Sequence, residues 1–424
     1  MPETLETSAA FSRRDWAEFS IAVVAGLGLA VTVLFLCAVP LAGHMAASRD
    51  FISYWATGKQ LVQHANPYDR PAVSRLEHAA GLNLQGVLIM RNPPWALPLA
   101  YPLGWFGLRV AALLWSLLLL ASLAISVMLV RALHGSPRSH IHWLGLAFTP
   151  ALICLTMGQT SLFALLGLAL FLRYHAERPL AAGTALWLCL LKPHLFLPFA
   201  AALAAWIVYA RAWKIVAGTA AAIAASSALA FLIDPDAWTN YAAMMRSPLV
   251  ENELVPCLSD ALRHWLWPQQ PWTRFIPAAV ACAWALLYYW RRRQQWNWTH
   301  HASPLMLVSL VTAPYCFLYD QGLAIPALLD AAYRTRRHAL LIGLSLLIVA
   351  VDIELAGVRI VSTWYLWTAP AWCGWYYLAL RPSSASQEMA TASAQSGIGA
   401  SLAGGSEFEA IPALGAGGTS HTRR

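Results

Sequence analysis

Charged residues are scarce in this chain, and their scarcity argues against an ordinary soluble domain. Asp, Glu, Lys and Arg make up 11% of the 424 residues, hydrophobic residues make up 59%, and the mean hydropathy is +0.53. A soluble domain usually carries about 25% charged residues. The composition predicts a polytopic membrane protein, and the 21 Trp and 14 Tyr fit the aromatic belts that settle at the headgroup level of a bilayer.

Paired cysteines, metal-ligand clusters and a glycine-rich nucleotide-binding loop are also lacking. The cysteines have no paired spacing, and most lie in or beside apolar runs, where a free thiol behaves as a small hydrophobe. They are Cys37, Cys154, Cys189, Cys257, Cys282, Cys316 and Cys373. We therefore expect no disulfide framework, no metal site and no cofactor. Nucleic acid is not an expected partner either, because the arginines lie in short clusters between apolar runs.

The chain does contain about twelve apolar runs, and several are short for a full crossing. The first run, residues 19–41, lacks a small-residue cleavage site after it and is long enough to span ~30 Å, which favours a retained helix. The stretch "LKPHLFLP" interrupts residues 180–209 with a lysine and two prolines, which predicts broken helices. We expect an all-α membrane protein of about 10–13 transmembrane or re-entrant helices.

Basic clusters predict the orientation in the membrane. They fall at alternate ends of successive runs and would face the cytoplasm: Arg13/Arg14, Arg131/Arg138, Arg173/Arg178, Arg211/Lys214, Arg291–Arg293, Arg334/Arg336/Arg337 and Arg381. This arrangement predicts a cytoplasmic segment 1–18, a membrane domain 19–381 in the cell membrane, and a disordered cytoplasmic tail 382–424 rich in Ser, Ala and Gly. The loops of residues 42–94 and 234–274 would then be extracytoplasmic.

The first outer loop breaks this pattern, because it is rich in cations: Arg49, Lys59, Arg70, Arg75 and Arg91. Cations retained against the orientation trend are explained by an anion that they bind, such as a phosphate at the membrane surface. Attraction to anionic lipid headgroups is the alternative explanation.

The same loop contains an acidic residue suited to proton transfer. In "SRDFISYWATGKQL", Tyr54 lies four residues after Asp50, so a helix would place both on one face. A carboxylate that is partly desolvated at the bilayer edge has a raised pKa, as a general base acting on a hydroxyl requires. The simpler alternative is that Asp50 only caps a helix.

Four further motifs place polar residues between apolar runs. They are "VLIMRNPPWALPLAYPL" with Arg91 and Asn92, "MGQTSLF" with Gln159, "LCLLKPHLFLPFA" with Lys192 and His194, and "APYCFLYDQGLAIPALL" with Tyr319 and Asp320. A lysine near a helix centre costs roughly 2.5–3.5 kcal/mol, so we expect Lys192 to have an anionic partner. Snorkelling of its ammonium to the interface is the alternative.

The order of these motifs resembles the family 87 glycosyltransferases, also described as domain of unknown function family 2029. "DFISY" after the first helix is followed by "NPYD", a double proline with a later "PL", "GQ", a "LKP" helix and a late "YD". The resemblance covers most of residues 45–330, and it implies the GT-C fold with a functional first extracytoplasmic loop.

The resemblance also implies an activity. Such an enzyme would take a hexose, typically mannose, from a polyprenyl phosphate carrier and attach it to a lipid-linked or envelope-glycan acceptor on the outer face. Carried over to this sequence, Asp50 would be the catalytic base and Lys192 would lie at the family's Lys-Pro. From these placements we expect a single displacement that inverts the configuration. Lys192, with Arg49 or Arg91, would neutralise the departing phosphate. The candidates for the remaining substrate contacts are Tyr54, Asn92, Gln159, His194, Tyr319 and Asp320.

Two other kinds of protein remain as alternatives. A transporter of a lipid-linked or small anionic solute would also use a broken helix such as that at "LKPH". Its coupling residues would lie at mid-membrane, however, whereas the acidic residues here lie mainly in the outer loops. A non-catalytic subunit of an envelope-synthesis complex would tolerate replacement of Asp50.

Overall fold

Every regular element in the described part of the chain is helical. The computed structural model describes residues 12–41, 49–82, 87–247 and 255–381. Its α-helices are α1 (Arg13–Leu41), α3 (Phe51–Val62), α4 (Arg70–Ala79), α5 (Leu97–Ala100), α6 (Leu108–Leu133), α7 (His142–Leu146), α8 (Thr149–Met157), α9 (Ser161–Tyr174), α10 (Pro179–Cys189), α11 (Leu197–Ala210), α12 (Trp213–Ile233), α13 (Ala237–Met245), α15 (Leu258–Leu266), α16 (Ile276–Arg292), α17 (Trp298–Thr312), α18 (Ile325–Arg334), α19 (His338–Gly357) and α20 (Thr368–Leu380).

Five helical segments within the described residues are long and apolar enough to cross a membrane. They are Arg13–Val39, Leu108–Leu133, Pro193–Ala210, Trp213–Ile233 and His338–Gly357. Shorter apolar helices cover His142–Met157, Ser161–Tyr174 and Pro179–Cys189. The chain is therefore an all-α polytopic membrane protein, as predicted. The predicted tail of residues 382–424 lies outside the described residues, whereas α1 begins at Arg13, inside the predicted segment 1–18.

The predicted interruptions of the apolar runs are present as short 3-10 helices. At "LKPH", α10 ends at Cys189 and the 3-10 helix η3 (Pro193–Phe196) precedes α11. At "LYDQ", the 3-10 helix η6 (Leu318–Ala324) leads into α18. Prolines cause these breaks, because a proline removes a backbone donor and clashes with the preceding turn. Each break presents polar side chains and backbone groups inside an otherwise apolar bundle.

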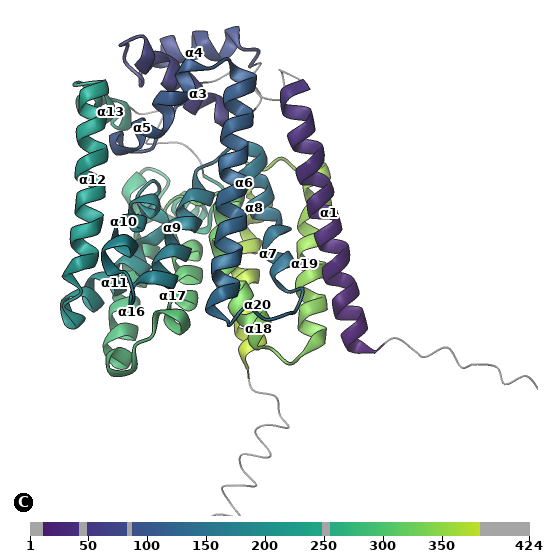
Figure 1. The fold of residues 1–424 in the computed structure, drawn as a ribbon. Coiled ribbons are helices and arrows are strands. Elements are labelled where there is room, and N and C mark those ends of the chain that lie inside the picture. The colour runs from purple at the N-terminus through teal and green to yellow at the C-terminus, as the bar shows by residue number, and fades with distance from the viewer. Residues whose placement is uncertain (1–11, 42–48, 83–86, 248–254, 382–424) are drawn as a thin grey trace, which may run out of the picture. The chain divides into compact units, whose positions relative to one another are not determined.

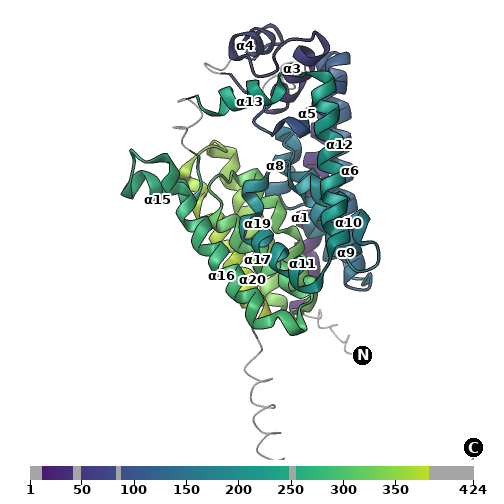
Figure 2. The ribbon, with the colours of Figure 1, turned by 90° about the vertical axis from the view of Figure 1, so that its left-hand side faces the viewer.

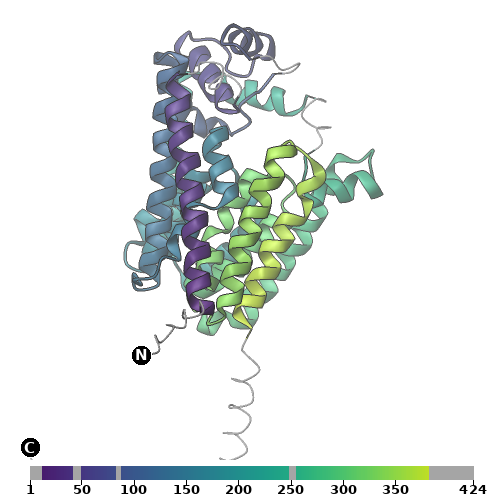
Figure 3. The ribbon, with the colours of Figure 1, turned by 90° about the vertical axis from the view of Figure 1, so that its right-hand side faces the viewer.

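The chain divides into residues 1–379 and a second unit of residues 380–424, and the first unit contains all the elements discussed below. In this unit α3, α4, α5 and α13 gather at one end, and the long helices α1, α6, α12 and α19 run away from it (Figures 1 and 2). Helix α1 packs along α19 and α6 (Figure 3). We call α3, α4, α5 and α13 the capping layer. Gly158, at the end of α8, lies against Phe51 of α3, so the bundle meets the capping layer at the break before α9.

Glycines allow the capping layer to pack closely. Helix α3 crosses the 3-10 helix η2 (Tyr101–Trp105) where Gly58 meets Gly104. A Cβ atom on either residue would overlap the backbone of the other element. This contact helps to fix α3, and with it the residues at its amino-terminal end, against the start of α6.

Candidate active site

A chain of hydrogen bonds joins four elements that are distant in the sequence. The amide Nε2 of Gln159 donates to Oδ2 of Asp50 at 2.8 Å. Its Oε1 accepts from Nζ of Lys192 at 3.0 Å and from the hydroxyl of Tyr54 at 3.3 Å. Nζ of Lys192 also donates to Oδ1 of Asp320 at 2.7 Å. The structure therefore brings together five of the residues that the sequence singled out.

Asp50 lies at the N-cap position of α3 but does not act as a cap. Its side chain makes no capping hydrogen bond, and its carboxylate is instead held by the amide of Gln159. No cation lies within ion-pair distance of this carboxylate among the described residues. Burial raises the pKa of Asp50 above its ordinary value, while the hydrogen bond from Gln159 and the charge of Lys192 oppose that rise. The carboxylate is thus positioned and has a proton affinity suited to a base.

Gln159 occupies the centre of the site because the chain turns sharply before it. Gly158 ends α8 in the left-handed conformation, with φ +77°, a conformation that glycine adopts at little cost. A Cβ there would lie 2.6 Å from Cβ of Phe51, so a larger residue would also collide with α3. The turn directs Gln159 between α3 and the "LKPH" break, where its amide separates Asp50 from Lys192.

Lys192 has the anionic partner that its sequence context predicted. Its side chain is 11% exposed and forms an ion pair with Asp320, so it is not snorkelling. The Asp320 carboxylate, 2.7 Å from Nζ, stabilises the charged ammonium form of Lys192. An ammonium has three N–H donors. Two are directed to Asp320 and Gln159, which leaves one for a ligand.

Asp320 supports the site by binding Lys192. Its Oδ1 also accepts from the hydroxyl of Ser161 at 2.5 Å, and its Oδ2 accepts from the backbone N–H of Phe317 at 2.9 Å. This carboxylate is 2% exposed and its bonding capacity is largely used. It is arranged to hold Lys192 in place. The ring of Tyr319 lies beside the ammonium, with its centroid 4.9 Å from Nζ.

The other predicted site residues lie around this chain of hydrogen bonds with different contacts. Arg49 is buried and donates to the carbonyls of Leu155 and Thr156 at the end of α8, at 3.0 Å to Leu155. Asn92 donates to the carbonyl of Leu191 at 2.8 Å, next to Lys192. Arg91 is exposed. The ring of His194 meets Tyr315 edge to face, with centroids 5.7 Å apart.

Two contributors were not identified from the sequence. Ser161 lies two residues after Gln159, inside the quoted "MGQTSLF", and its position before an apolar helix was a usable signal. Trp115 lies in the first third of α6. Its ring stacks on that of Tyr54, with the centroids 5.3 Å apart, and its indole N–H donates to the carbonyl of Gly158 at 2.8 Å. Nothing in its apolar surroundings distinguished it from a core residue. Within the described ranges, no group of three or more His, Cys, Asp or Glu residues could hold a metal ion.

Comparison with known proteins gives one match. The sequence model of glycosyltransferase family 87 matches residues 90–314, more than half of the 424 residues. No curated protein and no solved structure is significantly similar to the chain. The matched range contains Asn92, Gln159 and Lys192, whereas Asp50 precedes it and Asp320 follows it. The structure connects all of them except Asn92 through direct side-chain hydrogen bonds.

Proposed function

The chain belongs to glycosyltransferase family 87, and from this premise we propose that it moves a hexose, first of all mannose, from a polyprenyl phosphate to a lipid-linked or envelope-glycan acceptor on the extracytoplasmic face of the cell membrane. Family membership makes it a membrane enzyme that transfers a sugar, so the transporter alternative is dropped. The finer assignment of donor, acceptor and side of the membrane is the proposal.

The observation that carries the proposal is the pairing of Asp50 with a neutral amide. Of the two carboxylates in the hydrogen-bonded chain, Asp320 is tied up by Lys192, Ser161 and a backbone N–H. Asp50 has only the amide of Gln159 as its side-chain partner among the described residues. A carboxylate that is not neutralised by a cation keeps its capacity to accept a proton. Asp50 is therefore the better candidate for the base.

The proposed reaction is a single displacement at the anomeric carbon. Asp50 takes the proton from the acceptor hydroxyl as that oxygen forms its bond to the carbon. The bond between the carbon and the phosphate oxygen breaks, and its electron pair leaves on the phosphate. The remaining N–H of Lys192 stabilises the developing negative charge. Because the base and the cation lie on opposite sides of the Gln159 amide, the arrangement supports attack from the face opposite the phosphate, with inversion of configuration.

The predicted substrates also suit a site without a nucleotide-binding loop. A sugar on a polyprenyl phosphate is already activated by its phosphate leaving group. Each CH₂ of the carrier chain that is buried in an apolar environment contributes about 0.8 kcal/mol of favourable free energy. Tyr54, Tyr319 and His194 are proposed to contact the sugar, and Arg91 to approach the phosphate. Arg49 is proposed to act by fixing the end of α8, because its guanidinium contacts carbonyls there.

The test is a donor comparison with the purified protein in lipid nanodiscs. Radiolabelled mannose is supplied on polyprenyl phosphate or on a nucleotide diphosphate, together with an envelope lipid extract as acceptor. We expect transfer only from the polyprenyl phosphate donor, and a product whose anomeric configuration is inverted. Transfer only from the nucleotide donor would overturn the donor assignment, and retention of configuration would overturn the single displacement.

A further inference from the structure

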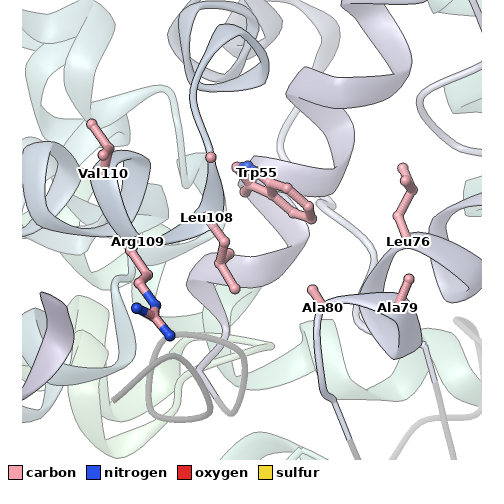
Figure 4. A pocket seen from close by; sticks show the side chains of 8 residues that line it. Trp55, Leu76, Ala79, Ala80, Leu108, Arg109 and Val110 are labelled. Atoms are coloured by element: carbon pink, nitrogen blue, oxygen red, sulfur yellow. The ribbon is translucent and has the colours of Figure 1, made fainter. Parts of the chain in front are cut away.

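A recess lies at the start of α6, and no residue of the hydrogen-bonded chain lines it. Its volume is about 500 Å³, within the range of about 300–1,000 Å³ typical of small-molecule sites. Helices α3 and α4 and the first turn of α6 surround it (Figure 4). The lining residues are Trp55, Leu76, Ala79, Ala80, Gly107, Leu108, Arg109 and Val110.

The walls of this recess are apolar. Leu76 of α4 and Ala80, the residue after α4, face Trp55 and Leu108 across it (Figure 4). The one polar atom of the Trp55 side chain is already satisfied, because its indole N–H donates to the carbonyl of Phe106 at 3.1 Å. An occupant therefore meets hydrocarbon and an aromatic ring along most of its length.

Of the described residues that line the recess, Arg109 is the one that carries a charge. Arg109 is exposed, and no ion pair or hydrogen bond of its guanidinium is found among the described residues. Glu77, the acidic residue of α4, does not compensate it, because its carboxylate is buried and accepts from the backbone N–H of Leu88. A second cation, Lys59, lies 5.6 Å from the centroid of the Trp55 ring. The charge beside this apolar recess is therefore positive.

The recess lies where a membrane-crossing helix begins. Helix α6 is one of the five membrane-spanning candidates, and Leu108 is its first residue. Immediately before it, the side chains of Trp105 and Phe106 are 65% and 41% exposed. Exposed aromatic residues at the end of an apolar span mark the headgroup level of the bilayer. A recess at this level is open to molecules that have an apolar chain and a polar head.

We propose that this recess binds an anionic phospholipid, with the phosphate on Arg109 and an acyl chain between Trp55, Leu76 and Leu108. The site is separate from the proposed donor site, but it shares α3 with it. Trp55 follows Tyr54 directly and lies five residues after Asp50, which corresponds to roughly 7.5 Å along a helix axis. Occupancy of the recess would therefore hold the helix that carries the proposed base.

The test is lipid binding, which does not depend on transferase activity. Purified full-length protein is titrated with phosphatidylglycerol or phosphatidylcholine, and bound lipid is counted by native mass spectrometry. We expect phosphatidylglycerol to be preferred, and Arg109→Gln to reduce that preference about fivefold, as loss of one cation near a lipid surface implies. Arg75→Gln, which removes an exposed cation of α4 outside the recess, is the matched control.

A second variant examines the apolar wall. Ala80→Phe fills the recess while keeping Arg109, and we expect it to weaken phosphatidylglycerol binding as well. Equal loss in Arg75→Gln and Arg109→Gln would overturn the proposal, because a general surface charge would then explain binding. Displacement of the lipid by inorganic phosphate alone, at millimolar concentration, would also overturn it, since the site would then recognise a free anion.

Discussion

At the scale of single residues, the ion pair between Lys192 and Asp320 has a structural role and a proposed chemical role, and substitution can separate the two. Lys192→Met leaves a buried carboxylate without its cation, and breaking a buried pair costs about 3–5 kcal/mol. We expect a marked drop in the thermal midpoint and loss of transfer. The double variant Lys192→Met/Asp320→Asn removes both charges, so it should recover most of the midpoint without recovering activity. Recovery of both would mean that Lys192 only holds the structure together.

A second prediction at this scale concerns pH. Asp50, the proposed base, can accept a proton only when it is ionised, and burial raises its pKa. Activity should therefore fall with decreasing pH at a higher pH than an ordinary aspartate, with a pKa of about 3.9, would give. Gln159→Leu removes a hydrogen bond that favours the ionised form, so it should move this acid limb to still higher pH. If the acid limb of the pH profile is unchanged in Gln159→Leu, then Gln159 does not influence the group that titrates. The pH profile of kcat/KM is the measurement.

Some of these residues could be identified from sequence because they stand out in an apolar context. Lys192, Gln159 and Asp320 each interrupt an apolar run, and such residues are costly unless they serve a purpose. Their contacts could not be predicted, since the partner of Lys192 lies 128 residues away. The same limit applies to Arg49, whose charge suggested a phosphate ligand but whose guanidinium contacts the carbonyls that end α8.

At the scale of elements, the turn between α8 and α9 decides where Gln159 lies. Gly158→Ala places a Cβ in a left-handed backbone conformation, which costs roughly 1 kcal/mol, and against Phe51. We expect a modest loss of thermal stability and a much larger loss of transfer, because Gln159 would be displaced from Asp50. Gly26→Ala in α1 is the control, since a Cβ there has no atom within 4 Å. Full activity of Gly158→Ala would contradict the positioning role of this turn.

Helix α4 contains a carboxylate whose ionisation should affect stability. Glu77 is fully buried, and burial raises its pKa to about 7. The folded state therefore binds a proton more tightly than the unfolded state, so stability should fall as pH rises from about 4.5 to 7 and then level off. Glu77→Gln keeps an acceptor for the N–H of Leu88. At pH 8 it should raise the thermal midpoint, with a gain of at most about 3 kcal/mol in the free energy of unfolding. It should have little effect near pH 4.5.

The comparison for Glu77 is an exposed acid. Glu18→Gln in α1, where the partner is Arg14 of the same helix, should change the midpoint little at either pH. If Glu77→Gln instead lowers the midpoint at pH 8, the surroundings stabilise the ionised carboxylate. That result would contradict the prediction that ionised Glu77 destabilises the fold.

The elements themselves were partly predictable. Proline and lysine within "LKPHLFLP" predicted a broken helix, and the chain does break between Cys189 and Pro193. The meeting of that break with the turn at Gly158 and with the start of α3 was not predictable, because it depends on packing between helices far apart in sequence. Trp115 shows the same limit: its stacking on Tyr54 has no local signal within α6.

At the scale of the whole molecule, composition settled the class. A chain with 11% charged residues had to bury its surface in lipid, and five helical segments of the described residues are long and apolar enough to cross a membrane. Family membership makes the molecule a glycosyltransferase. The capping layer of α3, α4, α5 and α13 then lies at one end of the bundle (Figure 1), and Asp50 lies where this layer meets the helix breaks.

The central claim is that Asp50 is the base of a polyprenyl-phosphate-dependent transfer. The most direct test measures radiolabelled mannose moving from polyprenyl-phosphate-mannose into lipid extract, using membranes with equal amounts of wild type or Asp50→Asn. The asparagine keeps the size of the side chain and an acceptor for Gln159, so the fold should survive. We predict transfer by the wild type and a loss of at least about a hundredfold in the variant, the low end of the range for a lost general base. Equal transfer by both proteins would contradict the account.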